Sequence, residues 1–162
     1  MKKQGFTLIE LMVVIVIMGI LAAVAVPKLF GMIAKSKASE VGPAAGTFVK
    51  LQEAYASENN AVGTWAAIGY KGPGSQNADG SGSATSTFTY SNTTKGNWIA
   101  TNGVALNDCQ ANNTWTVTSS YASGDVTTTA VSSNESTCVT PLTPNFCKIA
   151  TTGKCTAPAT GG

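Results

Sequence analysis

One uncharged apolar run near the N-terminus constrains the fold of this chain more than any other feature. Leu11 to Val26 gives sixteen consecutive residues without a charge, and extension back to Phe6 gives twenty-one residues with a single carboxylate, that of Glu10. A helix of this length is about 30 Å long, which is enough to cross the hydrocarbon of a bilayer. Lys2 and Lys3 precede the run and are expected to stay on the cytoplasmic side. The run therefore predicts a membrane-spanning helix.

Glu10 is the unusual residue of this run. A carboxylate inside an apolar span costs about 3 kcal/mol on insertion scales. One interpretation is that Glu10 lies near the lipid headgroups and is hydrated there. The other is that it meets a positive group from another chain, because a paired buried charge loses much of the penalty of an isolated one. We favour the second interpretation.

The segment from Lys2 to Ile15 resembles the prepilin motif shared by type IV pilins and type II secretion pseudopilins. It combines a short basic leader, the Gly5-Phe6 junction and an acid, Glu10, five residues past the glycine. This combination is highly specific, and Gly19 to Ala23 and Pro27 continue the match. The resemblance is near-complete over residues 1–30 and loosens towards residue 60, beyond which only the layout is similar.

The resemblance implies a processing site and a set of partners. A prepilin peptidase is expected to cut between Gly5 and Phe6 and to methylate the new amine of Phe6. The mature chain would wait in the inner membrane, where an assembly platform would add it to a helical filament of identical subunits, either extracellular or periplasmic. In that filament, Glu10 of one subunit is expected to meet the Phe6 ammonium of a neighbour. Pro27 removes a backbone donor and is a plausible place for the helix to kink.

The expected domain organisation has four parts: a leader at residues 1–5, a transmembrane and filament-core helix at 6–27, an amphipathic helix at 28–60 and a globular head at 61–162. Gly42 precedes Pro43, and the residue before a proline avoids the α region, so a break or kink is predicted at Pro43. Asn59-Asn60 predicts the end of the helix.

A stripe of apolar residues along the second helical part predicts packing against a downstream sheet. Its members recur at three- and four-residue steps: Val41, Ala44, Phe48, Leu51 and Tyr55. Core packing is the usual cause of such periodicity, which makes a cofactor-binding box the weaker interpretation.

The sequence of the head predicts a glycine-rich connector, then a meander of antiparallel strands, and then an irregular C-terminal segment. Residues 61–84 predict a surface loop, and residues 85–131 predict three to five antiparallel strands. Within them, Asn102-Gly103 predicts a type I′ hairpin between residues 98–101 and 104–106. Trp115 and Val117 are expected on one face of a strand, with a turn at residues 123–125. Residues 132–162 predict a loop over the sheet edge, with a loose tail from residue 156.

Four cysteines lie in the C-terminal half, namely Cys109, Cys138, Cys147 and Cys155. No Cys-x-x-Cys pair occurs, which disfavours a zinc or thioredoxin-like site. An even number of cysteines in an exported domain predicts two disulfides, for which three pairings are possible. We favour Cys109–Cys138 and Cys147–Cys155; the resemblance to type IV pilins also suggests the second bond, which closes a short C-terminal loop.

Composition argues against catalysis and against strong nucleic-acid binding. Histidine is absent, which removes the commonest general base and zinc ligand, and no nucleophile motif is present. Charged residues make up 11% of the chain, and no basic run follows Lys37. No cofactor is predicted. A calcium site built from Asp108, Asp125 and Glu135 is the weaker alternative, because hard oxygen ligands are few.

Together these features predict an α+β fold: a long N-terminal helix, its first half transmembrane, packed on a small antiparallel sheet with a disulfide-pinned C-terminal loop. The predicted function is that of a major pilin-like subunit, which polymerises into a type IV pilus for adhesion, motility or DNA uptake. Three alternatives remain: a major pseudopilin of type II secretion, a single-span anchored binding domain, and an ordinary signal peptide cleaved after Ala25.

Overall fold

The computed structural model describes residues 5–155, and the chain divides into two compact units between Ile33 and Ala34. The first helix, α1 (Leu8–Ala38), makes up most of the first unit, and only its last turn belongs to the second. The expectations for most of the leader, residues 1–4, and for the tail, residues 156–162, lie outside the described residues.

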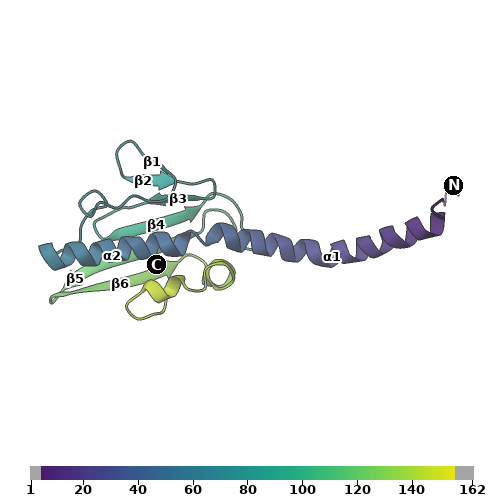
Figure 1. Cartoon of the computed structure of the whole chain (residues 1–162). Coiled ribbons are helices and arrows are strands. Elements are labelled where there is room, and N and C mark those ends of the chain that lie inside the picture. The colour runs from purple at the N-terminus through teal and green to yellow at the C-terminus, as the bar shows by residue number, and fades with distance from the viewer. Residues whose placement is uncertain (1–4, 156–162) are drawn as a thin grey trace. The chain divides into compact units, whose positions relative to one another are not determined.

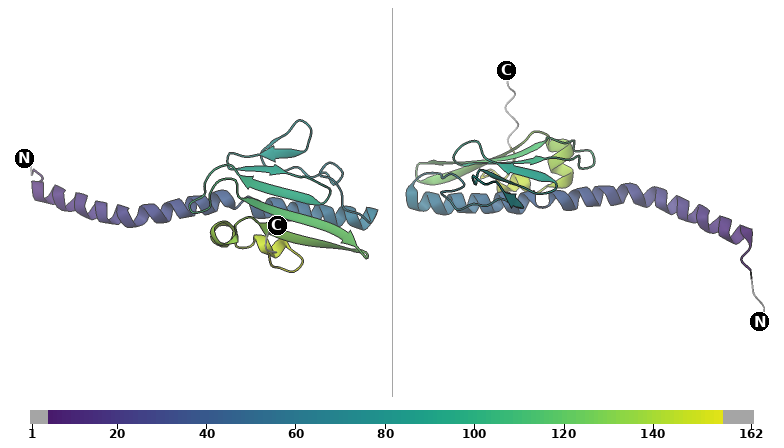
Figure 2. Two further views of the ribbon diagram at one scale, coloured as in Figure 1. Left: turned by 180° about the vertical axis from the view of Figure 1, so that it is seen from behind. Right: turned by 90° about the horizontal axis from the view of Figure 1, so that it is seen from above.

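The second unit is an antiparallel sheet with one helix on its face (Figure 1). The helix α2 (Val41–Asn59) contacts β4, β5 and β6, and Figure 2 shows it beneath the sheet. The strands follow the order of the sequence: β1 (Ser75–Gln76), β2 (Gly82–Ala84), β3 (Phe88–Ser91), β4 (Asn97–Asn102), β5 (Thr114–Ala122) and β6 (Asp125–Ser132). Three helical turns follow: η1 (Glu135–Val139), α3 (Thr140–Leu142) and η2 (Phe146–Ile149). The predicted α+β fold is confirmed.

The buried stripe of α2 places the helix on the sheet. Its buried members are Val41, Ala44, Ala45, Phe48, Val49, Gln52 and Ala56. The predicted members Leu51 and Tyr55 are only half-buried, because the stripe runs through Gln52 and Ala56 instead. The Gln52 amide donates to the Gly63 carbonyl at 2.9 Å and accepts from the Gly63 N–H at 2.9 Å, so this buried polar group is satisfied on both sides.

Both ends of α2 have a local cause. α1 and α2 are separated at Ser39 and Glu40. Pro43 has no N–H to donate to the carbonyl of Ser39 four residues earlier, so the ladder is interrupted there. At the other end, Asn60 adopts a left-handed conformation with φ of 51°, which stops the helix where the sequence predicted.

Glu40 ties the junction of the two helices to the sheet. Its Oε1 accepts hydrogen bonds from the Thr85 hydroxyl at 2.7 Å and from the Tyr90 hydroxyl at 2.9 Å. Thr85 lies between β2 and β3, and Tyr90 lies in β3. The start of α2 is therefore held to this part of the sheet by a half-buried carboxylate.

The sheet faces alternate as the sequence predicted. Trp115 and Val117 of β5 are fully buried, whereas Thr118 is exposed. Ser123 and Gly124 have φ of 56° and 91° and join β5 to β6 in a tight turn. Positive φ at both central positions is the requirement of a type I′ hairpin, whose twist matches that of the strands.

Two expectations for the strands are wrong. The predicted hairpin at Asn102-Gly103 does not form: β4 ends at Asn102, and the next paired strand is β5. Asn102 lacks the positive φ that a type I′ turn needs, and its side chain is buried instead. Its Nδ2 donates to the carbonyls of Val104 and Gln110 at 2.9 and 2.7 Å, and its Oδ1 accepts from Asn113 N–H at 2.7 Å.

The predicted connector, residues 61–84, is not a loop throughout, because it contains the short strands β1 and β2. The four strands β3 to β6 agree with the three to five predicted for residues 85–131, and the two additional strands bring the sheet to six. Glycine makes this pairing possible at β2. A Cβ at Gly82 would lie 2.5 Å from the Tyr90 carbonyl oxygen of β3. The glycine content of residues 61–84 therefore indicated close backbone approach here, and not only a loop.

The two disulfides are those favoured from the sequence. Cys109–Cys138 joins the loop after β4 to η1, and both cysteines are fully buried. Cys147–Cys155 closes a short loop at a sequence separation of 8. Next to it, Thr151 N–H donates to the Thr128 carbonyl of β6 at 2.8 Å, so the C-terminal segment covers the edge of the sheet as predicted.

We expect Asn102→Leu to destabilise the second unit by about 2–3 kcal/mol, because two carbonyls and one N–H lose their partner. The control Gln110→Ala removes an exposed side chain of the same loop and should change the free energy of unfolding by less than about 0.5 kcal/mol. Denaturant unfolding in detergent, followed by tryptophan fluorescence, measures both, since all three tryptophans are buried in this unit. Equal effects of the two substitutions would contradict the role of Asn102.

Stability should fall at alkaline pH. Burial raises the pKa of Tyr70 from 10.0 to about 12 despite the hydrogen bond from the Trp98 indole. Because the folded pKa lies above the unfolded one, the stabilising contribution is complete below pH 10 and is lost as pH rises towards 12. Denaturant midpoints measured across this range should fall steeply in the native chain and less steeply in Tyr70→Phe. An equally steep fall in that variant would contradict the assignment.

Candidate functional site

The first unit presents an apolar helix surface that the chain itself does not cover. No residue from Gly5 to Ile33 is buried; Phe6 is 87% exposed and Leu8 is 88% exposed. Burial begins only at Ala34 and Ala38, in the last turns of α1. By length and composition this helix is able to cross a membrane. Its apolar surface therefore needs either lipid or another protein surface around it.

Thr7 and Glu10 form a reciprocal cap at the start of α1. The Glu10 Oε2 accepts from the Thr7 N–H at 2.9 Å and from the Thr7 hydroxyl at 2.6 Å. In return, the Thr7 hydroxyl oxygen accepts from the Glu10 N–H at 3.3 Å. This is the capping-box arrangement, which satisfies N–H groups that the first turn of a helix leaves free.

The cap also gives Glu10 a defined position. A negative charge in the first turn of a helix is stabilised by the helix dipole. Oε2 is used by the cap, and the described residues 5–155 provide no hydrogen bond to Oε1. The carboxylate is therefore held at the tip of the helix with one oxygen available to a group from outside the chain.

The two prolines and Phe6 were the remaining site residues predicted in the helical part of the chain. Pro27 lies inside α1, which continues through it, and Pro43 is the third residue of α2. A kink at either proline stays a prediction. Phe6 precedes the helix and is exposed, next to the capping pair. The Gly5-Phe6 bond is thus accessible in the described part of the chain.

The acids proposed for calcium are not brought together. Among residues 5–155, no three His, Cys, Asp or Glu side chains gather where they could hold a metal ion. Asp108, Asp125 and Glu135 lie in separate parts of the head, after β4, at the start of β6 and in η1. The calcium alternative stays a prediction without a preformed site in the described residues.

Two functional features were missed in the sequence. The Thr7-x-x-Glu10 spacing before an apolar run is the sequence signature of a capping box and could have been identified. The link from Glu40 to Thr85 and Tyr90 has no local signature, because its partners lie 45 and 50 residues away.

Comparison with known proteins places the N-terminal segment in a family. Residues 1–26 match the family described as the prokaryotic N-terminal methylation motif. The chain therefore carries this motif over its first 26 residues. The exposed apolar helix and its capped start are the structural counterpart of that motif.

Curated proteins similar to part of the chain are type IV pilins and fimbrial proteins. The chain is 42% identical over 59 residues to the type IV major pilin protein PilA of Myxococcus xanthus (strain DK1622), covering 36% of this chain and 27% of PilA. It is 56% identical over 39 residues to a type IV major fimbrial protein FimA of Dichelobacter nodosus (24% and 25%), and 52% identical over 52 residues to another (32% of each). The chain spans about a quarter to a third of the length of these relatives. The resemblance to the type IV pilin family is confirmed over this segment.

Proposed function

We propose that this chain is the structural subunit of a type IV pilus. It is processed between Gly5 and Phe6, methylated on the Phe6 amine, held in the inner membrane by α1 and polymerised outward by an assembly platform. The observation that carries the proposal is the apolar segment from Phe6 to Ile33, in which no residue is buried although the head is folded. Its role is structural and not catalytic.

The exposed helix provides the cohesion of such a filament. Bundling of helices removes apolar surface from water at about 25 cal/mol per Å², which favours many copies side by side once the helices leave the lipid. Nineteen large apolar side chains from Phe6 to Ile33 are available for this contact. Before assembly the bilayer covers the same surface, so one helix serves both states.

Glu10 sets the register between neighbouring helices in this proposal. Its free Oε1 lies at the tip of α1, where the Phe6 ammonium of a neighbouring subunit can approach it. A charge pair of this kind is strong where water is excluded and costly when misplaced, so it selects one alignment of the helices. The cap contributes by fixing the carboxylate before the partner arrives.

The names of the curated relatives favour a pilus over the pseudopilus of type II secretion. The relatives with these identities are a major pilin and major fimbrial proteins. The end use of the filament, whether adhesion, motility or DNA uptake, is a property of its surface and not of α1.

We expect the mature chain to begin with a methylated Phe6. N-terminal sequencing and mass spectrometry of protein from the native membrane measure both features. Gly5→Asp is expected to leave the leader attached, because the small residue before the cut is replaced by a bulky anion. A mature chain that starts after Ala25 would instead identify an ordinary secretory signal and contradict the proposal, because α1 would be lost.

We expect Glu10→Gln to abolish filaments and Thr7→Ala to leave them. Gln retains the ability to accept the Thr7 N–H in a capping box but removes the charge, whereas Thr7→Ala removes the cap hydroxyl and keeps the charge. Shearing of cells followed by sedimentation and immunoblotting measures filaments. We expect at least a tenfold loss for Glu10→Gln and less than threefold for Thr7→Ala.

Three results would count against parts of this proposal. No sheared filaments from the native chain would favour the single-span binding domain. Normal filaments from Glu10→Gln would contradict charge pairing. Equal losses in Glu10→Gln and Thr7→Ala would assign Glu10 to helix capping alone.

A further inference from the structure

The charges of the described chain are balanced and yet unpaired. Loss of Lys2 and Lys3 with the leader leaves eight lysines and eight carboxylates, with no arginine. Among residues 5–155, no lysine forms an ion pair with a carboxylate. Because the described residues form no internal ion pair, their exposed charged side chains are available for contacts with other molecules.

Two carboxylates line a pocket at one end of the second unit. Glu53, Asn60, Tyr121, Gly124 and Asp125 line a pocket of about 500 Å³ between the C-terminal end of α2 and the β5–β6 turn. Figure 1 shows this turn beside that end of the helix. Inside the pocket, the Tyr121 hydroxyl donates to the Asn60 Oδ1 at 2.7 Å. Glu53 and Asp125 are both exposed, and Asp125 Oδ1 accepts from the Val126 N–H at 2.8 Å.

The helix itself adds to the negative potential of this pocket. The last turn of α2 contains Glu58 and no basic residue. The C-terminal end of a helix carries partial negative charge and is ordinarily stabilised by Lys or Arg. This end therefore lacks the cation that helix termini favour, and the pocket is suited to an ammonium group.

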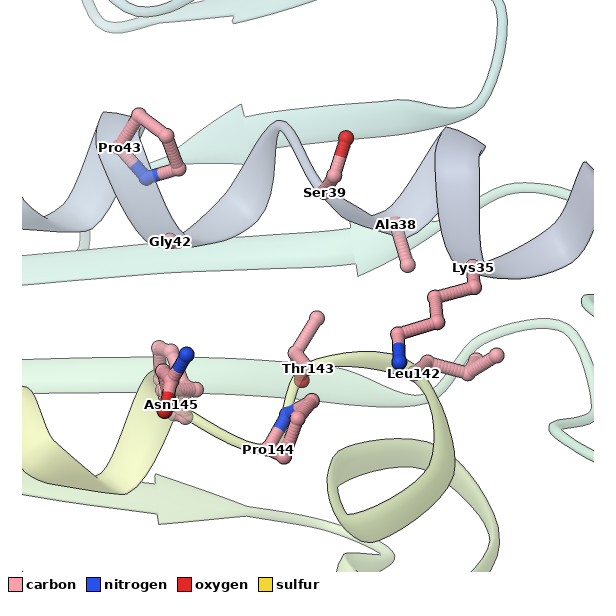
Figure 3. A pocket seen from close by; sticks show the side chains of 10 residues that line it. Lys35, Ala38, Ser39, Gly42, Pro43, Leu142, Thr143, Pro144 and Asn145 are labelled. Atoms are coloured by element: carbon pink, nitrogen blue, oxygen red, sulfur yellow. The ribbon is translucent and has the colours of Figure 1, made fainter. Parts of the chain in front are cut away.

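Lysine is available at the opposite end of the same unit. Lys35 and Lys37 lie in the last turn of α1, between the buried Ala34 and Ala38 in the sequence. Lys35 extends over a groove of about 310 Å³ and lies beside Leu142 (Figure 3). Lys37 is exposed and lines none of the pockets described here. Sixteen residues separate it from Glu53, which corresponds to about 25 Å along the helix axis.

We propose that the Glu53–Asp125 pocket of one copy receives Lys37 of a second copy of this chain. The contact rests on the proposed filament function and names a charge pair between heads, distinct from the pair at the helix tips. It joins two different surfaces, one basic and one acidic. Such a heterologous contact repeats without closing and generates an open helical filament. Electrostatic complementarity of this kind also fixes which alignment of the copies is allowed.

Charge reversal in the full-length chain tests the contact. Glu53→Lys and Lys37→Glu each convert attraction into repulsion at every repeat, and each is expected to reduce sheared filaments at least tenfold. The double variant restores the pair with reversed charges and should return filaments to within threefold of the native amount. Lys35→Glu, in the same helical turn, is the matched control and should retain filaments. Non-reducing gels of membrane fractions check that every variant forms both disulfides.

Each result supports or overturns the inference. Loss in both single variants with recovery in the double variant supports it. Filaments from both single variants at the native level overturn it while leaving the proposed function intact. Loss in Glu53→Lys without recovery in the double variant assigns the pocket to another cation, such as calcium, and overturns the lysine contact. Absence of filaments from the native chain overturns the proposed function and this inference together.

Discussion

The structure depends on an apolar helix surface that one copy of the chain cannot cover. From Phe6 to Ile33 no side chain is buried, although the head has a complete core of its own. Only a bilayer or further helices can remove such a surface from water. A carboxylate at the tip makes lipid the less favourable of these surroundings. In the proposed function the helix passes from the first of these environments to the second, and the head has to tolerate both.

The head meets this requirement by being self-contained. Its core is built from aromatic side chains of α2, of the segment between α2 and β1, and of the sheet. The Trp98 indole donates to the Tyr70 hydroxyl, which donates to the Ala44 carbonyl. Two disulfides close the C-terminal half, and the outer sheet face carries exposed hydroxyl side chains such as Thr118. The core needs nothing from α1 before Ala34, so the head can fold independently of the preceding part of that helix.

Sequence reasoning succeeded where a signal is local and failed where a side chain acts at a distance. Alternation located the buried face of β5 at Trp115, because period two depends only on neighbouring residues. Asn102-Gly103 is an equally local turn signal, but the Asn102 amide is used by backbone groups up to eleven residues away, and those contacts determine its conformation. The apolar run predicted the exposed helix α1, whereas the roles of Phe6 and Glu10 in assembly stay predictions. The cap by Thr7 is local and was predictable, whereas Glu40 could be understood only with its distant partners in place.

The link at Glu40 has a mechanical consequence. A subunit of the proposed filament would transmit tension along its helix, and the helical hydrogen-bond ladder is interrupted at Ser39 and Glu40. The carboxylate that binds Thr85 and Tyr90 lies at this interruption and joins it to the sheet. Part of a tensile load on the helix is thereby transferred to hydrogen bonds in the β2–β3 region. The load therefore does not fall on one turn of backbone alone.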